Sequence, residues 1–276
     1  MARTPLVLLP PSEGKAAGGS GRPWAPGSTS FPELDDARRQ LIAALATAMD
    51  RPEPARRKLL GVKGAALEAA TGANRAVAAA PTRPAIERYT GVLYDALDAG
   101  SLPARERRRL REQVVVFSGL WGLVQPGDAI ADYKLKMGAV LPPFGRLSTW
   151  WRPAVTEALA PRVDGRVVWD LLPQEHRAAW APTTAQSDGA PRTVITVRFL
   201  DETSPPGAEG ADRAFTTVNH WNKLLKGALV RHVLTHQLRD PDGLARFTHP
   251  EGYVYDPSLT EDAAGHLAVA LVRPAR

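Results

Sequence analysis

Residues 114–126 read VVVFSGLWGLVQP, and this stretch decides the fold class. Its first four residues form a β-branched and aromatic run closed by Ser118 and Gly119, which predicts a buried strand of a parallel or central sheet. A glycine just past a strand end lets the backbone approach a ligand closely. Loops at the carboxyl edge of such strands bind ligands in open α/β sheets. The stretch therefore predicts an α/β protein with a functional surface directly after this strand.

Other short apolar runs predict further strands, and helical periodicity predicts the segments between them. We expect strands at 5–9, 113–117, 167–170, 193–200 and 214–219, and closing strands around 253–255 and 268–272. We expect helices at 34–49, 54–60, 65–71, 104–112, 147–159 and 219–236, with a helix or a strand-turn-helix at 84–99. The loop from 10 to about 31 is rich in Gly, Pro and Ser, and is either a functional lid or partly disordered.

The composition sets broad limits on the protein. Its 276 residues are 44% hydrophobic, enough for a substantial core. We expect one α/β or α+β domain over residues 1–276, with a mixed central sheet and a helical excursion at 34–112. The absence of cysteine excludes disulfides, thiolate metal sites and direct peroxide sensing by a thiol. The N-terminal apolar run is too short for a signal sequence and no stretch approaches ~20 apolar residues, so we expect a cytoplasmic protein with no membrane partner.

Charge favours an anionic partner without identifying it. The formal net charge is +6 and the sequence pI is near 9.8. Basic residues cluster at 56–58 and at 105–109. The second cluster is most simply a solvated helix face.

Two predicted helices meet at the sequence LLGVKG, residues 59–64, within a helix-hairpin-helix-like segment at 55–77. Gly61 and Gly64 permit a tight turn that aims backbone N–H groups at the start of the next helix, where the helix dipole favours a phosphate. Lys58 and Lys63 add positive charge beside it. An ordinary helical hairpin, with the glycines as a C-cap and a close-packing site, is the alternative.

Six blocks of sequence follow one another along nearly the whole chain: LLPPSEGK (8–15), YTGVLY (89–94), FSGLWGLVQP (117–126), YKLKMG (133–138), KLLKGALVR (223–231) and EGY (251–253). In this order the blocks resemble the YaaA family of bacterial peroxide-stress proteins. That family often has a lysine before the glycine of the second block; here the residue is Thr90, which removes one candidate phosphate contact. The resemblance implies a cytosolic role that limits oxidative damage, an unusual fold and a DNA-binding helix-hairpin-helix.

The candidate binding residues lie at strand ends, in glycine-rich turns or on polar helix edges. For nucleic acid or phosphate we predict Lys15, Lys58, Gly61, Lys63, Gly64, Ser118, Gly119, Trp121, Lys134, Lys226 and Arg231. The cationic side chains would neutralise phosphates, and Trp121 or Tyr133 would stack on an exposed base. The alternative for Trp121 is a place in the core.

An enzyme acting on a nucleotide or a small phosphorylated metabolite is the second hypothesis. Asp132 or Asp170 would then be the base, Tyr133 an orienting hydroxyl, and Lys15 and Lys226 an anion clamp. The alternative for the two aspartates is a turn or cap role. Their convergence on a closed cavity would favour the enzyme.

Several other chemistries are disfavoured. Ser118 lacks the preceding Gly-x of a nucleophile elbow, and the glycines before Lys15 lack Walker spacing. His232 and His236 stand i,i+4, but no Glu follows His232 as in zincins, so we interpret the six histidines as helix-surface residues and predict neither a metal nor a cofactor. The leading hypothesis is a cytosolic DNA-binding protein of the oxidative stress response that binds duplex or distorted DNA through a basic cleft with little sequence specificity.

Overall fold

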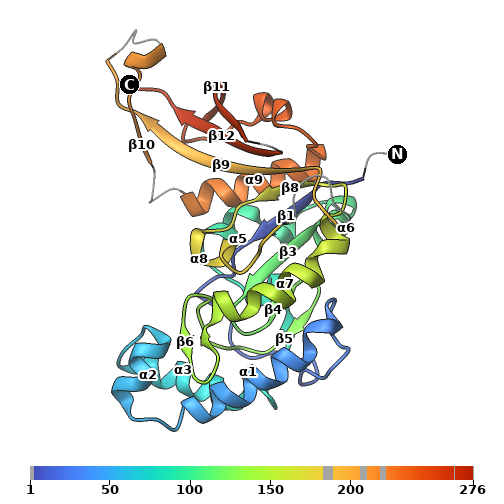
Figure 1. Cartoon of the computed structure of the whole chain (residues 1–276), viewed down its shortest axis with the longest axis vertical. Coiled ribbons are helices and arrows are strands. Elements are labelled where there is room, and N and C mark those ends of the chain that lie inside the picture. The colour runs from blue at the N-terminus through green and yellow to red at the C-terminus, as the bar shows by residue number, and fades with distance from the viewer. Residues whose placement is uncertain (1–2, 183–188, 206–209, 218–221, 264, 276) are drawn as a thin grey trace.

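The computed structural model describes residues 3–182, 189–205, 210–217, 222–263 and 265–275. These residues form a mixed α/β structure around an eight-stranded sheet in the order β11-β12-β9-β8-β1-β3-β4, with β10 paired to β9 (Figure 1). The strands are β1 (Leu6–Leu9), β3 (Val114–Ser118), β4 (Gly122–Val124), β8 (Val167–Asp170), β9 (Thr193–Glu202), β10 (Phe215–Thr217), β11 (Val254–Ala263) and β12 (His266–Arg273). The predicted mixed sheet is confirmed.

The centre of the sheet is parallel and its edges are antiparallel. β1 pairs in parallel with β3 and with β8, β8 with β9, and β9 with β12. β4, β10 and β11 pair antiparallel with their neighbours. Every residue of β1, β3 and β8 is buried, as expected for parallel strands covered on both faces. The strand predicted from residues 114–117 is therefore confirmed as a central one.

The helices cover the sheet and extend below it in Figure 1. They are α1 (Asp35–Ala48), α2 (Glu53–Leu60), α3 (Ala65–Ala76), α4 (Ala85–Arg88), α5 (Val92–Leu97), α6 (Ala104–Gln113), α7 (Leu147–Val163), α8 (Gln174–Arg177) and α9 (Asn222–His236), with 3-10 turns at Pro32–Leu34, Ala99–Ser101, Gly210–Asp212 and Pro241–Arg246. Two small ladders pair β2 (Arg83–Pro84) with β5 (Ala129–Ile130) and β6 (Val140–Leu141) with β7 (Gly145–Arg146). Residues 218–221, where the predicted strand 214–219 ends and the predicted helix 219–236 begins, lie outside the described residues.

The loop that follows β1 is held against residues 82–90. Ala16 N donates to Arg88 O at 2.8 Å, and Gly21 and Thr82 exchange backbone hydrogen bonds of 2.9 and 3.2 Å. A Cβ on Gly21 would lie 2.4 Å from Thr82 Oγ1, so only glycine allows this approach. The loop is therefore an ordered part of the fold in the described chain.

The helix pair predicted at 55–77 is present as α2 and α3, which lie at the lower end of the molecule in Figure 1. Gly61 ends α2 with φ +66°, and Gly64 precedes α3 with φ +57°. Both values fall where side chains are disfavoured, so the two glycines make the turn possible. DNA binding by this pair stays a prediction.

One buried arginine joins α1 to the edge of the sheet. Arg38 is fully buried; its Nε donates to Trp121 O at 3.0 Å and its Nη2 to Leu123 O at 2.7 Å. Its Nη1 donates to Asp35 Oδ1 and to Thr29 Oγ1, each at 2.6 Å. The guanidinium thus satisfies carbonyl groups beside the edge strand β4 that would otherwise be buried without a partner.

Replacing Arg38 by Ala should lower the free energy of unfolding by about 3–5 kcal/mol, because it removes the donor to one oxygen of Asp35 and to three buried backbone carbonyls. Denaturant unfolding measures this loss. The matched control is Arg39→Ala, since Arg39 is exposed and pairs with Asp36 at the surface. That change should cost no more than about 0.5 kcal/mol, and an equal loss in the two variants would contradict the role of Arg38.

Candidate functional site

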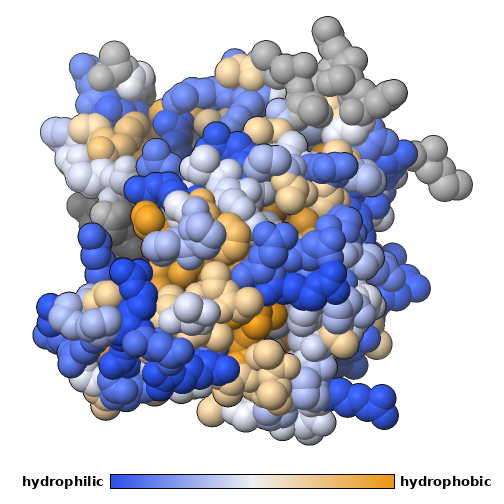
Figure 2. Space-filling view, turned by 60° about the horizontal axis from the view of Figure 1, so that its bottom comes forward, coloured by the Kyte–Doolittle hydropathy of each residue, from blue (hydrophilic) through white to orange (hydrophobic). Residues whose placement is uncertain are grey.

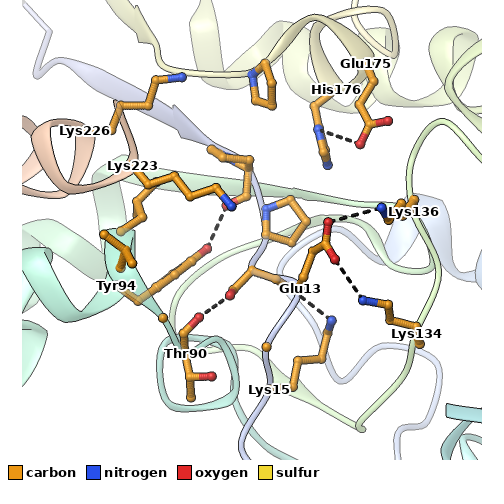
Figure 3. Close-up of a pocket in the computed structure, with 18 of the residues that line it drawn as sticks. Glu13, Lys15, Thr90, Tyr94, Lys134, Lys136, Glu175, His176, Lys223 and Lys226 are labelled. Atoms are coloured by element: carbon orange, nitrogen blue, oxygen red, sulfur yellow. Dashed lines mark hydrogen bonds and ion pairs between the residues drawn. The ribbon is translucent and has the colours of Figure 1, made fainter. Parts of the chain in front are cut away.

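A pocket of about 530 Å³ opens at the carboxyl ends of β1 and β8 (Figure 3). After β1 the chain proceeds to β3 on one side of it, and after β8 it proceeds to β9 on the other. Ligands of open α/β sheets bind where adjacent strands lead in opposite directions. The lining comes from residues 10–15, 90–94, 133–136, 173–176 and 222–226. We call this the lysine pocket.

Five lysines line the pocket: Lys15, Lys134, Lys136, Lys223 and Lys226. Two carboxylates, Glu13 and Glu175, accompany them. Glu13 Oε2 lies 3.1 Å from Lys134 Nζ, and its Oε1 lies 3.2 Å from Lys136 Nζ (Figure 3). The hydrogen bond from Lys134, followed by that from Lys136, holds the pKa of Glu13 below its usual range despite partial burial. Positive charge therefore exceeds negative charge in the lysine pocket.

The amines of Lys15 and Lys226 are largely buried. Lys15 Nζ donates to Ser12 O at 3.0 Å and lies 4.3 Å from the centre of the Tyr133 ring. Lys226 Nζ donates to Leu171 O at 2.8 Å. Burial lowers the pKa of each to about 8, opposed by Asp132 at Lys15 and by Asp170 at Lys226. Both amines therefore titrate close to neutral pH.

Tyr133 lines the pocket and belongs to a buried chain of hydroxyl groups behind it. Tyr133 OH lies 2.7 Å from Ser118 Oγ and 3.0 Å from Tyr89 OH. Ser118 Oγ also accepts from Trp121 N at 2.9 Å. Burial raises the pKa of Tyr133 to about 12, so this side chain remains a phenol. A Cβ on Gly119 would lie 2.6 Å from Leu135 O, so the predicted glycine permits the close contact between β3 and this wall.

His176 is the histidine of the pocket. It is buried, and its Nδ1 has no hydrogen-bond partner among the described residues. Burial, followed by the charge of Lys226, lowers the pKa of His176 to about 4, although Nδ1 lies 3.7 Å from Glu175 Oε1. The ring is neutral near pH 7. The interpretation of every histidine as a helix-surface residue is wrong at this position, and also at His249, which lies in a loop, and His266, which lies in β12.

The structure does not bring the two predicted catalytic aspartates together at the pocket. Neither Asp132 nor Asp170 is among its lining residues. Asp170 Oδ2 accepts from Arg177 Nε at 2.6 Å, and its Oδ1 accepts from Leu172 N at 2.9 Å. Asp132 Oδ1 accepts from Tyr133 N at 2.7 Å. These are turn and cap contacts, and the carboxylates that do face the pocket are glutamates.

Two further predicted residues lie elsewhere. Trp121 is fully buried against Trp24 and Tyr133, so its indole has no surface to offer a base. Arg231 Nη1 donates to Leu97 O at 3.2 Å and to Asp98 O at 3.1 Å, which ties α9 to the end of α5 outside the pocket lining.

The predicted hairpin residues lie beside the pocket. Lys58, Gly61, Lys63 and Gly64 are exposed and do not line it. A Cβ on Gly61 would lie 3.8 Å from Lys136 Nζ. The turn of the helix pair therefore adjoins a wall lysine of the pocket.

Sequence reasoning missed Glu13, Lys136, Glu175, His176 and Lys223 as site residues. Glu13 and Lys136 stand two residues from predicted site lysines, and Lys223 shares a helix face with Lys226 at i,i+3 spacing. The spacing of these three residues from predicted site lysines could have identified them from the sequence. The short helix α8 that carries Glu175 and His176 had none, because its place at the pocket depends on the sheet order.

Within the described ranges, no group of three or more His, Cys, Asp or Glu side chains is arranged to hold a metal ion. The rings of His232 and His236 lie 4.5 Å apart but form only a pair. No helix in the part of the chain that the structure describes is both long and apolar enough to cross a bilayer.

Known proteins similar to this chain share most of its length. Residues 6–259 match the family model described as peroxide stress protein YaaA. A UPF0246 protein of Streptomyces coelicolor is 41% identical over 229 residues, which cover 83% of this chain and 82% of that protein. A UPF0246 protein of Corynebacterium glutamicum is 37% identical over 231 residues, 82% of this chain and 83% of that protein. A UPF0246 protein of Roseobacter denitrificans is 32% identical over 184 residues, which cover 65% of this chain and 66% of that protein.

The buried His176 makes stability depend on pH. Its pKa is about 4 in the folded chain against 6.5 unfolded, so the unfolded chain binds more protons between these values and stability is lost as pH falls through this window. Between pH 7 and pH 5 the loss from this group is about 2 kcal/mol. Denaturant unfolding of His176→Asn at both pH values should show a pH dependence smaller by that amount. Exposed His236→Asn is the control, and an unchanged pH dependence in His176→Asn would contradict the assignment.

Proposed function

The chain belongs to the peroxide stress protein YaaA family, and from this membership and the lysine pocket we propose that it is a DNA-binding protein of the peroxide stress response. It would act in the cytosol and bind duplex or distorted DNA with little sequence specificity. The observation that carries the proposal is the closeness of the turn between α2 and α3 to the pocket: a Cβ on Gly61 would lie 3.8 Å from Lys136 Nζ. A DNA backbone would then contact both the turn and the pocket lysines, two elements suited to phosphates.

The turn has the features of a phosphate site at a helix N-terminus. α3 has 12 residues, and Gly64 at its N-cap leaves the first backbone N–H groups uncovered by a side chain. Residues 63–66 are all exposed. Lys58 in the last turn of α2 and Lys63 in the hairpin add charge. The helix dipole and these cations favour the same ligand, a backbone phosphate.

The lysine pocket continues this surface toward the sheet. Its five amines outnumber its two carboxylates, and the hairpin meets it at Lys136. Figure 2 shows strongly hydrophilic residues gathered at lower left, on the side of α2 and α3. Contacts of this kind go to phosphate and sugar, which explains the expected low sequence specificity. A chain without cysteine has no thiol for peroxide to oxidise, so its stress role would not run through a cysteine.

A nucleotide or small phosphorylated metabolite is the second candidate ligand. A volume of about 530 Å³ falls within the range of small-molecule pockets. Apolar Val92, Leu93 and Leu135 stand beside the lysines in the lining. Such a ligand would displace DNA in competition, so titration of labelled duplex, gapped and single-stranded DNA in the presence of free nucleotides separates the two candidates.

Replacing both Lys58 and Lys63 by Ala should weaken DNA binding roughly tenfold or more and reduce the slope of log K against log salt by about two, because each lost phosphate contact accounts for about 0.9. Fluorescence anisotropy over a salt series measures both quantities.

The matched control replaces Arg105 and Arg108 on the exposed face of α6, which lies on the other side of the molecule from α2 in Figure 1. It removes the same charge and should leave the slope nearly unchanged. Equal effects of the two double variants would show that net charge alone binds DNA and would remove the hairpin from the proposal.

Glu13→Gln should act in the opposite direction. Glu13 occupies the amines of Lys134 and Lys136, so its neutralisation frees two cations for phosphate. We expect tighter DNA binding and a salt slope steeper by about one to two. Glu33→Gln removes one exposed charge away from the pocket and serves as the comparison. If the two variants bind DNA equally well, the lysine pocket takes no part in binding.

A further inference from the structure

Lys15 stands apart from the other amines of the lysine pocket. Lys134 and Lys136 are paired with Glu13, and Lys223 is exposed. Lys15 makes no ion pair with any described residue; its Nζ has one hydrogen bond, to Ser12 O, and rests on the face of Tyr133. A second ring, that of Tyr89, lies 5.7 Å away. The amine thus faces the cavity from an aromatic floor.

The ring of Tyr133 and the carbonyl of Ser12 stabilise the protonated amine, but burial in the pocket wall outweighs them and favours the free amine. A desolvated lysine near other cations loses its proton readily, and the free amine attacks carbonyl carbon. Burial lowers the pKa of Lys15 to about 8, Asp132 opposes the shift and Lys134 adds to it. About a quarter of the molecules would carry a neutral amine at pH 7.5. An ordinary lysine would carry less than about 1%.

We propose that Lys15 captures the aldehyde of an abasic deoxyribose in DNA as a Schiff base. The proposal rests on the DNA binding proposed above, which supplies the sugar with its flanking phosphates. An abasic sugar exposes C1′ as an aldehyde in its ring-opened form and has no base to fill the pocket. Intact nucleotides lack that aldehyde, so the chemistry selects damaged sites.

The neighbouring charges fit a sugar with a phosphate on it. Lys134 and Lys136 hold the two oxygens of Glu13 about 3 Å from their amines, which is also the spacing at which they would hold phosphate oxygens. A phosphate bound there would displace Glu13. The negative charge of Glu13 stabilises the protonated form of Lys15 and thereby raises the pKa of Lys15. The released carboxylate would leave the two lysine amines free to hold the phosphate beside Lys15.

The step balances without a redox partner. The lone pair of Lys15 Nζ attacks C1′, and the carbonyl oxygen takes a proton to become the hydroxyl of a carbinolamine. Nζ loses a proton to solvent, the hydroxyl takes a proton from solvent and leaves as water, and a protonated C=N bond remains. One neutral amine, one aldehyde and one proton from solvent thus give one iminium ion and one water. Tyr133 remains a phenol throughout and supports the amine.

Borohydride trapping tests the proposal, because hydride reduces an iminium to a stable secondary amine. Labelled duplex with one abasic site is incubated with the full chain at concentrations that saturate each variant, as measured by anisotropy, and then reduced. We expect a covalent adduct that maps to Lys15 by peptide mass and that falls at least about tenfold in Lys15→Arg. Lys15→Arg keeps the cation and all six other lysines, so it also measures background trapping. The rate of adduct formation should rise as pH passes through about 8.

Each contrary outcome has a distinct meaning. Binding of the abasic duplex without an adduct overturns the Schiff base and leaves DNA binding intact. An adduct undiminished in Lys15→Arg overturns the assignment to Lys15. Trapping of a free sugar phosphate aldehyde without trapping of abasic DNA overturns the DNA source and supports a metabolite in the pocket. Failure to bind any DNA overturns the proposed function together with this inference.

Discussion

The hydrogen bond between Ser118 Oγ and Tyr133 OH is the contact on which the lysine pocket depends. It joins the end of a central parallel strand to a loop segment that is otherwise without regular structure. Gly119 lets that segment approach the strand, and a side chain there would collide with Leu135 O. Because Tyr133 is fixed from below, its ring supports Lys15, and the residues after it present Lys134 and Lys136 to the cavity.

The sequence revealed most of the sheet because its central strands are buried on both faces. A run such as 114–117 is short, β-branched and aromatic, and is followed by Gly119, which together favour a buried strand over a buried helix. The edges were harder to predict. β11 continues to Ala263 through polar residues, since an edge strand faces solvent and its pairing with β12 depends on a distant segment. α7 continues past the predicted end at 159 to Val163, because the buried Val163 holds its last turn despite Pro161.

The candidate site was predictable where a residue lies in a motif and its strand end leads directly to the pocket. Lys15 and Lys134 met that condition, and Lys226 was recognisable as the polar edge of a helix. Asp170 does not line the pocket for a local reason: a carboxylate at a strand end serves the next turn as readily as it serves a ligand, and here Leu172 N and Arg177 take both oxygens. His176 failed for a global reason, since only the order of β8 beside β1 brings α8 to the cavity.

Five amines around one cavity repel each other, and the chain reduces this repulsion in two ways. At the solvent side, Glu13 offsets part of the charge of Lys134 and Lys136, and water screens the remainder. Toward the interior, Lys15 and Lys226 lose protons more readily than ordinary lysines. An anion entering the pocket would replace Glu13 and stabilise the protonated amines, so binding and proton uptake are linked. An aldehyde would have the opposite effect, because it consumes the neutral amine. Burial lowers the fraction of Lys15 that is protonated, and it thereby raises the fraction whose free amine can act as a nucleophile.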